Sequence, residues 1–253
     1  MTEYQEARFN RLCREIIVTG HTAGEAGIGT LAEKRLHAVI KRYLCEDRNC
    51  HEVGLDGTRY VSDVRIGKEI YEVQTGSFYP MKRKIAYYLE HTDCSVTVVH
   101  PIPTVKGVSW IDPATGDISQ RTRSTKRGRT LDLLPELYHL LPHLQNERLK
   151  FRVLLFEAED FRLLNGWSRD KKRGSARYER VPLRLLDDLE FDGAEGFRAL
   201  LPSAIPPHFT VKDFSKHTKI RGRNAYSAVR ALAALGVVRA ADPIGASMGW
   251  ALT

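Results

Sequence analysis

The sequence lacks any apolar run long enough to cross a lipid bilayer. Hydrophobic residues make up 42% of its 253 residues, but they occur in runs well below the roughly 18 residues that a membrane-spanning helix needs. The N-terminal residues, Met-Thr-Glu-Tyr-Gln-Glu, also lack the basic start and apolar stretch of a secretory signal peptide. We therefore expect no membrane partner and a cytoplasmic location.

Cysteine is scarce as well. The four cysteines, Cys13, Cys45, Cys50 and Cys94, are too few and too irregularly spaced for a disulfide framework. Cys45, Cys50 and His51 form a short cluster, but the second half of a zinc site is not evident elsewhere in the sequence. We expect reduced thiols, with a zinc site as the less favoured alternative.

Acidic residues are outnumbered by basic ones. The 39 Lys and Arg against 31 Asp and Glu give a formal net charge of +8 and an isoelectric point near 9.3, which favours a polyanionic partner. Positive charge concentrates in an acid-free stretch at 121–129 and in a second run at 169–180. Two solvated loops are the alternative, but two such runs in an otherwise charge-balanced chain favour phosphate contact. The candidate nucleic-acid-binding residues here are Arg121, Arg123, Lys126, Arg127, Arg129, Lys171, Lys172 and Arg173.

The first part of the chain has the element order of an α/β fold. The predicted elements are a helix at 31–44, strands at 53–55, 59–66 and 69–74, a helix at 80–90 and a strand at 95–99, closed by His100-Pro101. Apolar residues at helical spacing and a capping box of Thr30 and Glu33 indicate the first helix. Asp56-Gly57 and Gly67-Lys68 favour turns between the strands. We assign residues 1–145 to this first domain.

The middle of the chain mixes strand and helix signals. We expect a hairpin from 108–112 and 117–121 around Pro113-Ala-Thr-Gly116, then a helix at 131–141 and a strand at 151–156. Residues 158–180 are polar, and we expect a helix followed by a basic loop. We assign 146–202 to a connecting basic segment.

The sequence pattern changes beyond Pro202. Thr210-Val-Lys-Asp213 is a capping signature for a short helix, and 221–235 has helical apolar spacing with Gly236 at the C′ position. Residues 237–240 and 249–252 can pair as a hairpin. Helix, turn, helix and a two-stranded wing are typical of a winged helix. We predict a winged-helix-like nucleic-acid-binding domain at 203–253, with Arg221, Arg223 and Asn224 at the start of its recognition helix.

Two acids on neighbouring predicted strands suggest chemistry: Asp63, then Glu72-Val73-Gln74. Residues two apart in a strand share a face, so Glu72 and Gln74 should project together, and the neighbouring strand can bring Asp63 beside them. Two carboxylates and the Val73 carbonyl are hard oxygen ligands of the kind that Mg²⁺ takes. Solvent-facing acids are the alternative, but burying acids among apolar strands is costly without a metal or partner.

This pattern resembles the PD-(D/E)XK nuclease superfamily over about residues 28–101. The resemblance implies a restriction-endonuclease-like core, with a central mixed sheet flanked by helices, and hydrolysis of phosphodiester bonds with Mg²⁺ or Mn²⁺. It makes Glu33 the helical acid, Asp63 and Glu72 metal ligands, and Gln74 the residue that positions the water. The segments Glu33–His37 and Glu72–Phe78 are also similar to a group of uncharacterised bacterial proteins that continue into a C-terminal helical module.

The sequence departs from the superfamily at Gln74, where a lysine is usual. An ammonium stabilises developing negative charge, whereas a neutral amide can only hydrogen-bond. Some restriction endonucleases of this fold also have glutamine there. Lys34, Lys82 or Lys84 could supply the charge from a helix, and we prefer Lys82 and Lys84 because the helix opening with Pro80 directly follows the motif strand.

These observations favour a metal-dependent deoxyribonuclease, with an endonuclease preferred. DNA is the expected partner because winged helices usually serve duplex DNA, which is an analogy of fold. The alternatives are a catalytically silent DNA-binding or regulatory protein with a nuclease fold, and an RNA-processing nuclease. A homodimer is left open.

Overall fold

A computed structural model of the chain describes residues 1–22, 35–55, 57–164 and 176–253. These residues divide into two compact units, each assembled from three pieces of chain. Unit 1 comprises Met1–His51, Pro101–Gly128 and Leu154–Asp188, and unit 2 comprises Glu52–His100, Arg129–Val153 and Leu189–Thr253. Three long strands contribute residues to both units: β4 (Ser95–Ile111), β6 (Leu149–Leu163) and β7 (Ala176–Phe191).

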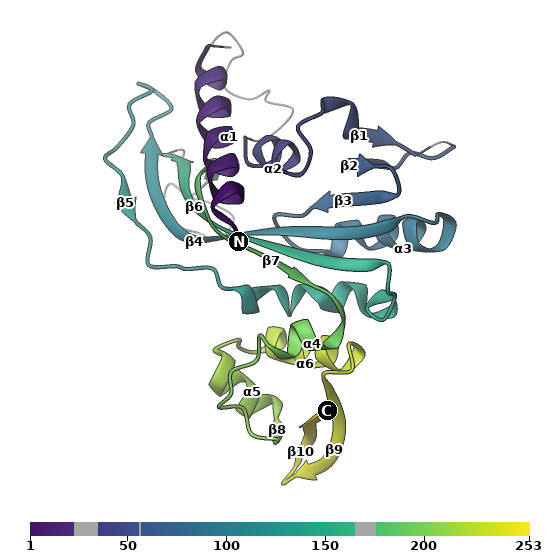
Figure 1. Cartoon of the computed structure of the whole chain (residues 1–253). Helices are drawn as coiled ribbons and strands as arrows, with labels where there is room; N and C mark the ends of the chain where they lie inside the picture. The colour runs from purple at the N-terminus through teal and green to yellow at the C-terminus, as the bar shows by residue number, and fades with distance from the viewer. Residues whose placement is uncertain (23–34, 56, 165–175) are drawn as a thin grey trace. The chain divides into compact units, whose positions relative to one another are not determined.

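The main sheet is mixed, and helices pack around it, so the class is α/β as expected (Figure 1). The strand order is β1-β2-β3-β4-β6-β7, and β5 (Thr122–Arg123) pairs with β4. The first three strands are β1 (His51–Gly54), β2 (Val61–Ile66) and β3 (Glu69–Val73). β3 pairs antiparallel with β2 and parallel with β4. The three strands predicted at 53–55, 59–66 and 69–74 are confirmed as β1, β2 and β3, which are neighbours in the sheet.

A helical crossover connects β3 to the parallel strand β4. A parallel pair cannot be joined by a tight turn, and here the connection is the 3₁₀-helix η2 (Tyr79–Met81) followed by α3 (Lys82–His91). α3 buries Ile85, Tyr88 and Leu89, at the i, i+3 and i+4 spacing of one helical face. The helix predicted at 80–90 is confirmed, with a 3₁₀ first turn.

Unit 1 contains the helices α1 (Glu3–Thr22) and α2 (Arg35–Leu44). α2 confirms the described part of the helix predicted at 31–44. The Phe9 ring of α1 packs edge-on against the Tyr43 ring of α2, with centroids 5.3 Å apart. Within the described ranges no helix combines the length and the hydropathy that crossing a bilayer requires.

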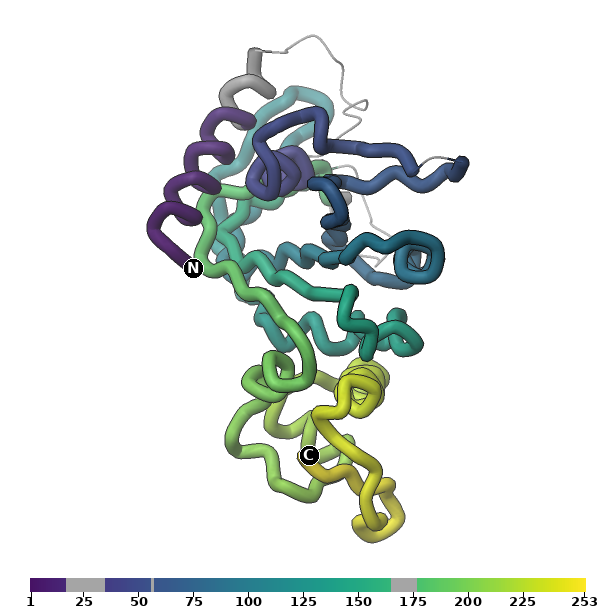
Figure 2. The backbone as a smooth tube through the Cα atoms, turned by 45° about the vertical axis from the view of Figure 1, so that its right-hand side comes forward, coloured from purple at the N-terminus to yellow at the C-terminus, as the bar shows by residue number. Residues whose placement is uncertain are grey.

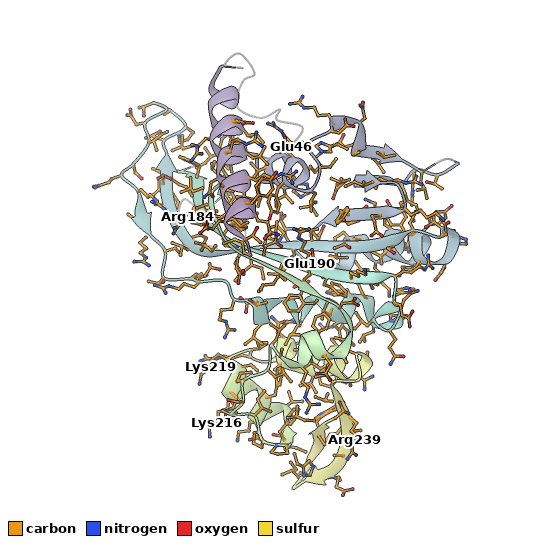
Figure 3. The ribbon with its side chains drawn as sticks, in the orientation of Figure 1. Glu46, Arg184, Glu190, Lys216, Lys219 and Arg239 are labelled. Carbon is orange, nitrogen blue, oxygen red and sulfur yellow. The ribbon has the colours of Figure 1, made fainter. Side chains whose placement is uncertain are left out.

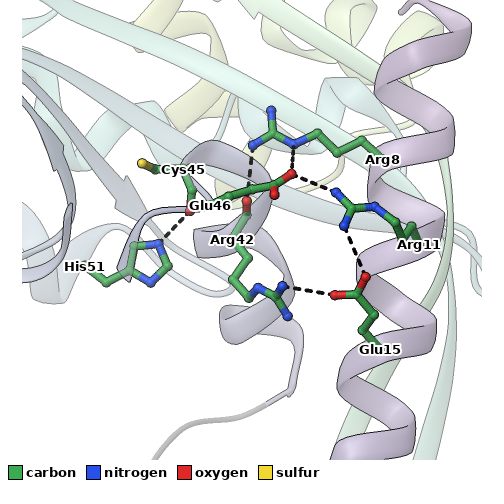
Figure 4. A network of polar contacts seen from close by, with 7 residues as sticks. All are labelled: Arg8, Arg11, Glu15, Arg42, Cys45, Glu46 and His51. Carbon is green, nitrogen blue, oxygen red and sulfur yellow. Dashed lines mark hydrogen bonds and ion pairs between the residues drawn. The ribbon is translucent and has the colours of Figure 1, made fainter. Parts of the chain in front are cut away.

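Ion pairs join the same two helices (Figure 4), and the Arg8 guanidinium carbon lies 5.7 Å from the Tyr43 ring centroid. The Glu46 carboxylate, just after α2, accepts from Arg11 at 2.7 Å and pairs with Arg8 at 3.2 Å. Glu15 of α1 accepts from Arg42 of α2 at 3.0 Å and from Arg11 at 3.1 Å. Because these side chains are partly exposed, the network contributes little to the free energy of folding and mainly orients the two helices relative to each other.

The strand predicted at 117–121 is reduced to a single bridge between Ile118 and Ile111. Three further elements differ from the predictions. β4 does not end at His100-Pro101 but continues to Ile111. Its pairing with β3 ends at Val99, so Pro101, which has no backbone N–H, interrupts no hydrogen bond between these two strands. The helix predicted at 131–141 is two 3₁₀-helices, η3 (Thr130–Leu133) and η4 (Glu136–His143), because Pro135 and Pro142 interrupt a regular α-helix.

The last of these differences concerns the start of 158–180, predicted as a helix. Residues 158–163 belong to β6, where Ala158 and Asp160 are buried and Glu159 and Phe161 are less so. This period of two is that of a strand. Residues 165–175 of the predicted loop lie outside the described residues.

The C-terminal residues of unit 2 form a small module of helices and a three-stranded antiparallel sheet, in the order β8-β10-β9. Its elements are α4 (Gly193–Arg198), β8 (His208–Thr210), α5 (Val211–Thr218), α6 (Arg223–Ala234), β9 (Val238–Ile244) and β10 (Ser247–Leu252). The Thr210–Asp213 capping box is confirmed. Figure 2 shows β9 and β10 as the closing hairpin of the chain. Only glycine fits at Gly249, because a Cβ there would lie 2.0 Å from the Asp242 carbonyl oxygen.

Candidate active site

The β2–β3 pair places Asp63 and Glu72 side by side. Val64 pairs with Tyr71, so the next position along the antiparallel ladder sets Asp63 beside Glu72 on the same face. One Asp63 carboxylate oxygen, Oδ2, accepts the backbone N–H of Val73 at 2.7 Å. This bond orients the Asp63 carboxylate toward β3, next to Glu72.

Glu72 is a nearly buried acid with only 4% of its surface exposed. Its Oε2 accepts from the Lys84 ammonium at 2.6 Å, and its Oε1 accepts from the Tyr88 hydroxyl at 3.1 Å. Burial raises the pKa of Glu72 to about 7; the charge of Asp63 adds to this rise, and Lys84 and Tyr88 oppose it. The Glu72 carboxyl therefore exchanges its proton near neutral pH.

α3 supplies both partners of Glu72 from one helical face. Lys84 and Tyr88 are four residues apart, so their side chains are neighbours on the helix surface, and the Lys84 ammonium lies 5.9 Å from the Tyr88 ring centroid. Burial, together with the charge of Glu72, raises the pKa of Tyr88, which keeps its hydroxyl protonated as a donor. Tyr60 packs against Tyr88 and Tyr87, with ring centroids 6.3 and 5.1 Å away.

Gln74 follows the last residue of β3. Its side-chain amide donates to the carbonyl of Ser77 at 2.6 Å, and among the described residues no hydrogen bond joins it to Asp63 or Glu72. The Gln74 carbonyl accepts from Nδ1 of His100 at 2.6 Å, which holds the end of β3 in place, and burial lowers the pKa of His100.

Of the two favoured lysines, Lys84 reaches the site and Lys82 does not. Lys82 is exposed at the start of α3, and among the described residues no hydrogen bond or ion pair joins it to Asp63 or Glu72. The hydrogen bond from Tyr88 to Glu72 was missed by the sequence reasoning. The signal that could have found it is the helical spacing of Lys84 and Tyr88 directly after the motif strand.

The donor set suits a hard divalent cation. A carboxylate offers about four lone-pair positions, so the hydrogen bonds that Asp63 and Glu72 accept leave capacity for a metal ion. Residues 1–22, 35–55, 57–164 and 176–253 contain no group of three or more His, Cys, Asp or Glu that could hold a metal. Glu33, the third acid implied by the resemblance, lies outside the described residues.

Two arginines of the first basic stretch have internal partners. Arg121 donates to Glu157 at 3.0 Å and lies across Gly107, where a Cβ would be 2.0 Å from the arginine Nε. Arg129 donates to the carbonyl of Thr218 at 2.7 Å and to Asp132 at 3.1 Å. These two side chains therefore stabilise the structure locally.

The remaining candidates differ in what surrounds them. Arg123, Lys126 and Arg127 are exposed, and no ion pair holds them within the part of the chain that the structure describes. Lys171, Lys172 and Arg173 lie outside the described residues. Arg221, Arg223 and Asn224 are exposed at the start of α6, as predicted.

The exposed face of α6 extends beyond the predicted residues. Tyr226 is 49% exposed, and Arg230 is exposed as well; with Arg223 they occupy the i, i+3 and i+7 positions of one face. Lys216 and Lys219 lie close to each other at α5 (Figure 3) and are also exposed. Arg230 was missed because it stands among the apolar residues that mark the buried face of the helix.

Comparison with known proteins identifies one family. The model of the "Domain of unknown function (DUF8091)" matches residues 34–192. No curated protein and no solved structure matches the sequence. The matched residues include Asp63, Glu72 and Lys84 and end before β8. Because the match spans more than half of the chain, the protein belongs to the DUF8091 family.

Proposed function

We propose that the protein is a metal-dependent deoxyribonuclease of the PD-(D/E)XK type. The observation that carries this proposal is the pairing of Asp63 and Glu72 on adjacent strands, with the Lys84 ammonium 2.6 Å from Glu72. The order of elements along the chain supports it, because the resemblance implies a helix, strands that carry the two acids, a second helix and a further strand, and α2, β2, β3, α3 and β4 follow in that order. Lys84 supplies the positive charge that Gln74 cannot.

Asp63, Glu72 and the Val73 carbonyl would hold Mg²⁺ or Mn²⁺, with Glu33 as the further acid. When bound, such a cation polarises a phosphoryl oxygen and lowers the pKa of an attacking water. Asp63 is held in place by the Val73 N–H, and Tyr88 orients Glu72. Lys84 is positioned to stabilise negative charge that develops on a phosphate near Glu72, which is the role of preorganised cations at such sites.

The C-terminal module serves the same proposal as a winged-helix-like DNA-binding domain. Two helices followed by a β-hairpin, with β8 as the third strand, match that outline. The exposed face of α6, with Arg223, Asn224 and Arg230, is its recognition surface, and the β9–β10 hairpin is its wing. Phosphate contacts from these side chains would place the duplex without reading its sequence.

Cleavage assays test the catalytic assignment. With Mg²⁺ or Mn²⁺ the protein should cut plasmid, linear, single-stranded or branched DNA, and a chelator should stop it. Asp63→Ala and Glu72→Ala should each lower the cleavage rate by at least about 100-fold, because each removes a ligand of the metal. Glu69→Ala, on the same strand β3, is the matched control and should cut at the wild-type rate. Failure to cut any substrate, or undiminished cutting by the two site variants, contradicts the proposal.

A catalytically silent DNA-binding protein is the second candidate. The observation that favours it is that Glu72 already has two internal partners, Lys84 and Tyr88, while the amide of Gln74 is engaged with Ser77. Gln74→Lys restores the residue usual in the superfamily and separates the two functions. A wild type that is inert on every substrate, together with a Gln74→Lys variant that cuts, supports the silent binder.

A further inference from the structure

Several cations of unit 1 interact electrostatically with one buried acid and with one another. The strands that carry them hold none of the residues of the proposed active site. We call Lys106 of β4, Arg162 of β6, and Arg177 and Arg180 of β7, with Asp160 of β6, the Asp160 cluster. β6 lies between β4 and β7 in the sheet. Asp160 is 1% exposed. Arg180 donates two hydrogen bonds to its carboxylate, from Nε at 2.6 Å and from Nη2 at 2.9 Å.

Lys106 and Arg177 share the charge of this one acid with Arg180. Burial lowers the pKa of Lys106, and the charges of Arg180, Arg162 and Lys126 lower it further, against the opposing charge of Asp160. Burial also lowers the pKa of Arg177, and Arg180 and Arg162 add to that effect, again opposed by Asp160. Positive charges held together in this way gain free energy when an anion joins them.

The cluster can be reached from solvent and continues along β4. Arg177 is exposed and Lys106 is half-buried. Thr104 and Trp110 share a strand face with Lys106, because they lie at even spacing from it. The Trp110 ring lies 6.0 Å from the Arg162 guanidinium carbon, and the Thr104 hydroxyl is buried without a hydrogen-bond partner among the described residues.

We propose that the Asp160 cluster binds the phosphate groups of a nucleic-acid backbone. The three neighbouring strands lie about 4.8 Å apart, so the cations extend over about 10 Å, a length over which one DNA strand presents more than one phosphate. Cations on three neighbouring strands suit such a row of charges better than one small anion. The identity of the phosphate carrier as DNA rests on the proposed function.

Binding in the absence of metal tests the cluster separately from catalysis. The probe is a fluorescent duplex DNA oligonucleotide, titrated with the whole protein in a chelator at several salt concentrations. Lys106→Ala and Arg177→Ala should each weaken binding about three- to ten-fold and reduce the slope of log affinity against log salt by about 0.9 for each phosphate that is no longer neutralised. Arg184→Ala is the control, because Arg184 is on β7 but faces Glu157 at 3.8 Å.

Two further measurements keep the outcomes distinct. Lys106→Arg keeps the charge and should bind as the wild type does, and equal melting temperatures would show that a weaker variant is folded. Wild-type affinity and salt slope in both alanine variants, or wild-type binding that does not depend on salt, overturns the inference. If the wild type cuts DNA and the cluster variants bind DNA normally, the inference is wrong and the proposed nuclease activity still holds. If the wild type cuts nothing but the cluster variants bind DNA more weakly, the inference holds and the proposed nuclease activity is wrong.

Discussion

At the scale of single residues, the buried Glu72 carboxyl couples folding to pH. Its pKa is about 7 in the folded chain against an ordinary value of 4.5. A folded-state pKa above the unfolded value means that the folded chain holds the proton more tightly. The stability from this proton is fully present below pH 4.5 and is lost as the pH rises through 7.

We therefore expect the free energy of unfolding of the metal-free protein to fall by about 3 kcal/mol, relative to Glu72→Gln, between pH 4.5 and pH 8. The glutamine variant lacks the titrating group and supplies the reference at each pH. Urea unfolding in a chelator measures both proteins. Parallel pH profiles for the two would show that Glu72 has an ordinary pKa.

The sequence was sufficient to predict the two acids and a lysine from the following helix, but not which lysine reaches them or the hydrogen bond from Tyr88. Asp63 and Glu72 follow from strand patterning and from turns that set neighbouring strands in register. The bond from the Gln74 amide to the Ser77 carbonyl was not predicted, because it forms in the turn after β3, beyond the strand pattern of the motif. The choice of Lys84 over Lys82 depends on how α3 is rotated on the sheet, which tertiary packing decides.

At the scale of elements, Arg148 ties the end of α3 to the sheet. Its guanidinium donates to the carbonyls of Thr92 at 2.6 Å and Cys94 at 3.1 Å, and also to that of Leu89. The last carbonyls of a helix have no partner within the helix, and a cation near that end also meets the negative pole of the helix dipole.

Arg148→Met should therefore destabilise the protein by about 2–3 kcal/mol, because it leaves partly buried carbonyls without donors. Arg83→Met, at an exposed position of α3, should change stability by less than about 0.5 kcal/mol. Chemical denaturation at one pH compares the two variants with the wild type. Equal, small effects would mean that water replaces the guanidinium without loss.

The prediction of helices and strands succeeded where the signals are local in sequence. It failed where pairing between strands distant in sequence determines the structure. Turn residues and helix spacing predicted β1 to β3, α3 and the C-terminal helices and hairpin. The length of β4 beyond Pro101 and the strand character of 158–163 depend on neighbouring strands that are distant in sequence. Prolines at 135 and 142 were visible in the sequence, and weighting them more would have indicated the 3₁₀-helices.

At the scale of the whole molecule, net charge overstates the charge available to a partner. Arg121, Arg129 and Arg180 stand in the basic runs of the sequence, yet each pairs with an acid in the structure. A linear run of cations cannot show which of them face acids on neighbouring strands. The surfaces where cations outnumber acids, the Asp160 cluster and the outer face of α6, combine residues from inside and outside those runs.

The central claim is that Asp63, Glu72 and Lys84 form a catalytic site, and single-turnover cleavage by lysine variants tests it most directly. With saturating Mg²⁺ the wild type should cut DNA, Lys84→Met should cut at least about 100-fold more slowly with unchanged DNA affinity, and Lys82→Met should stay within about twofold of the wild type. Cleavage by Lys84→Met at the wild-type rate, or a wild type that never cuts, would contradict the account.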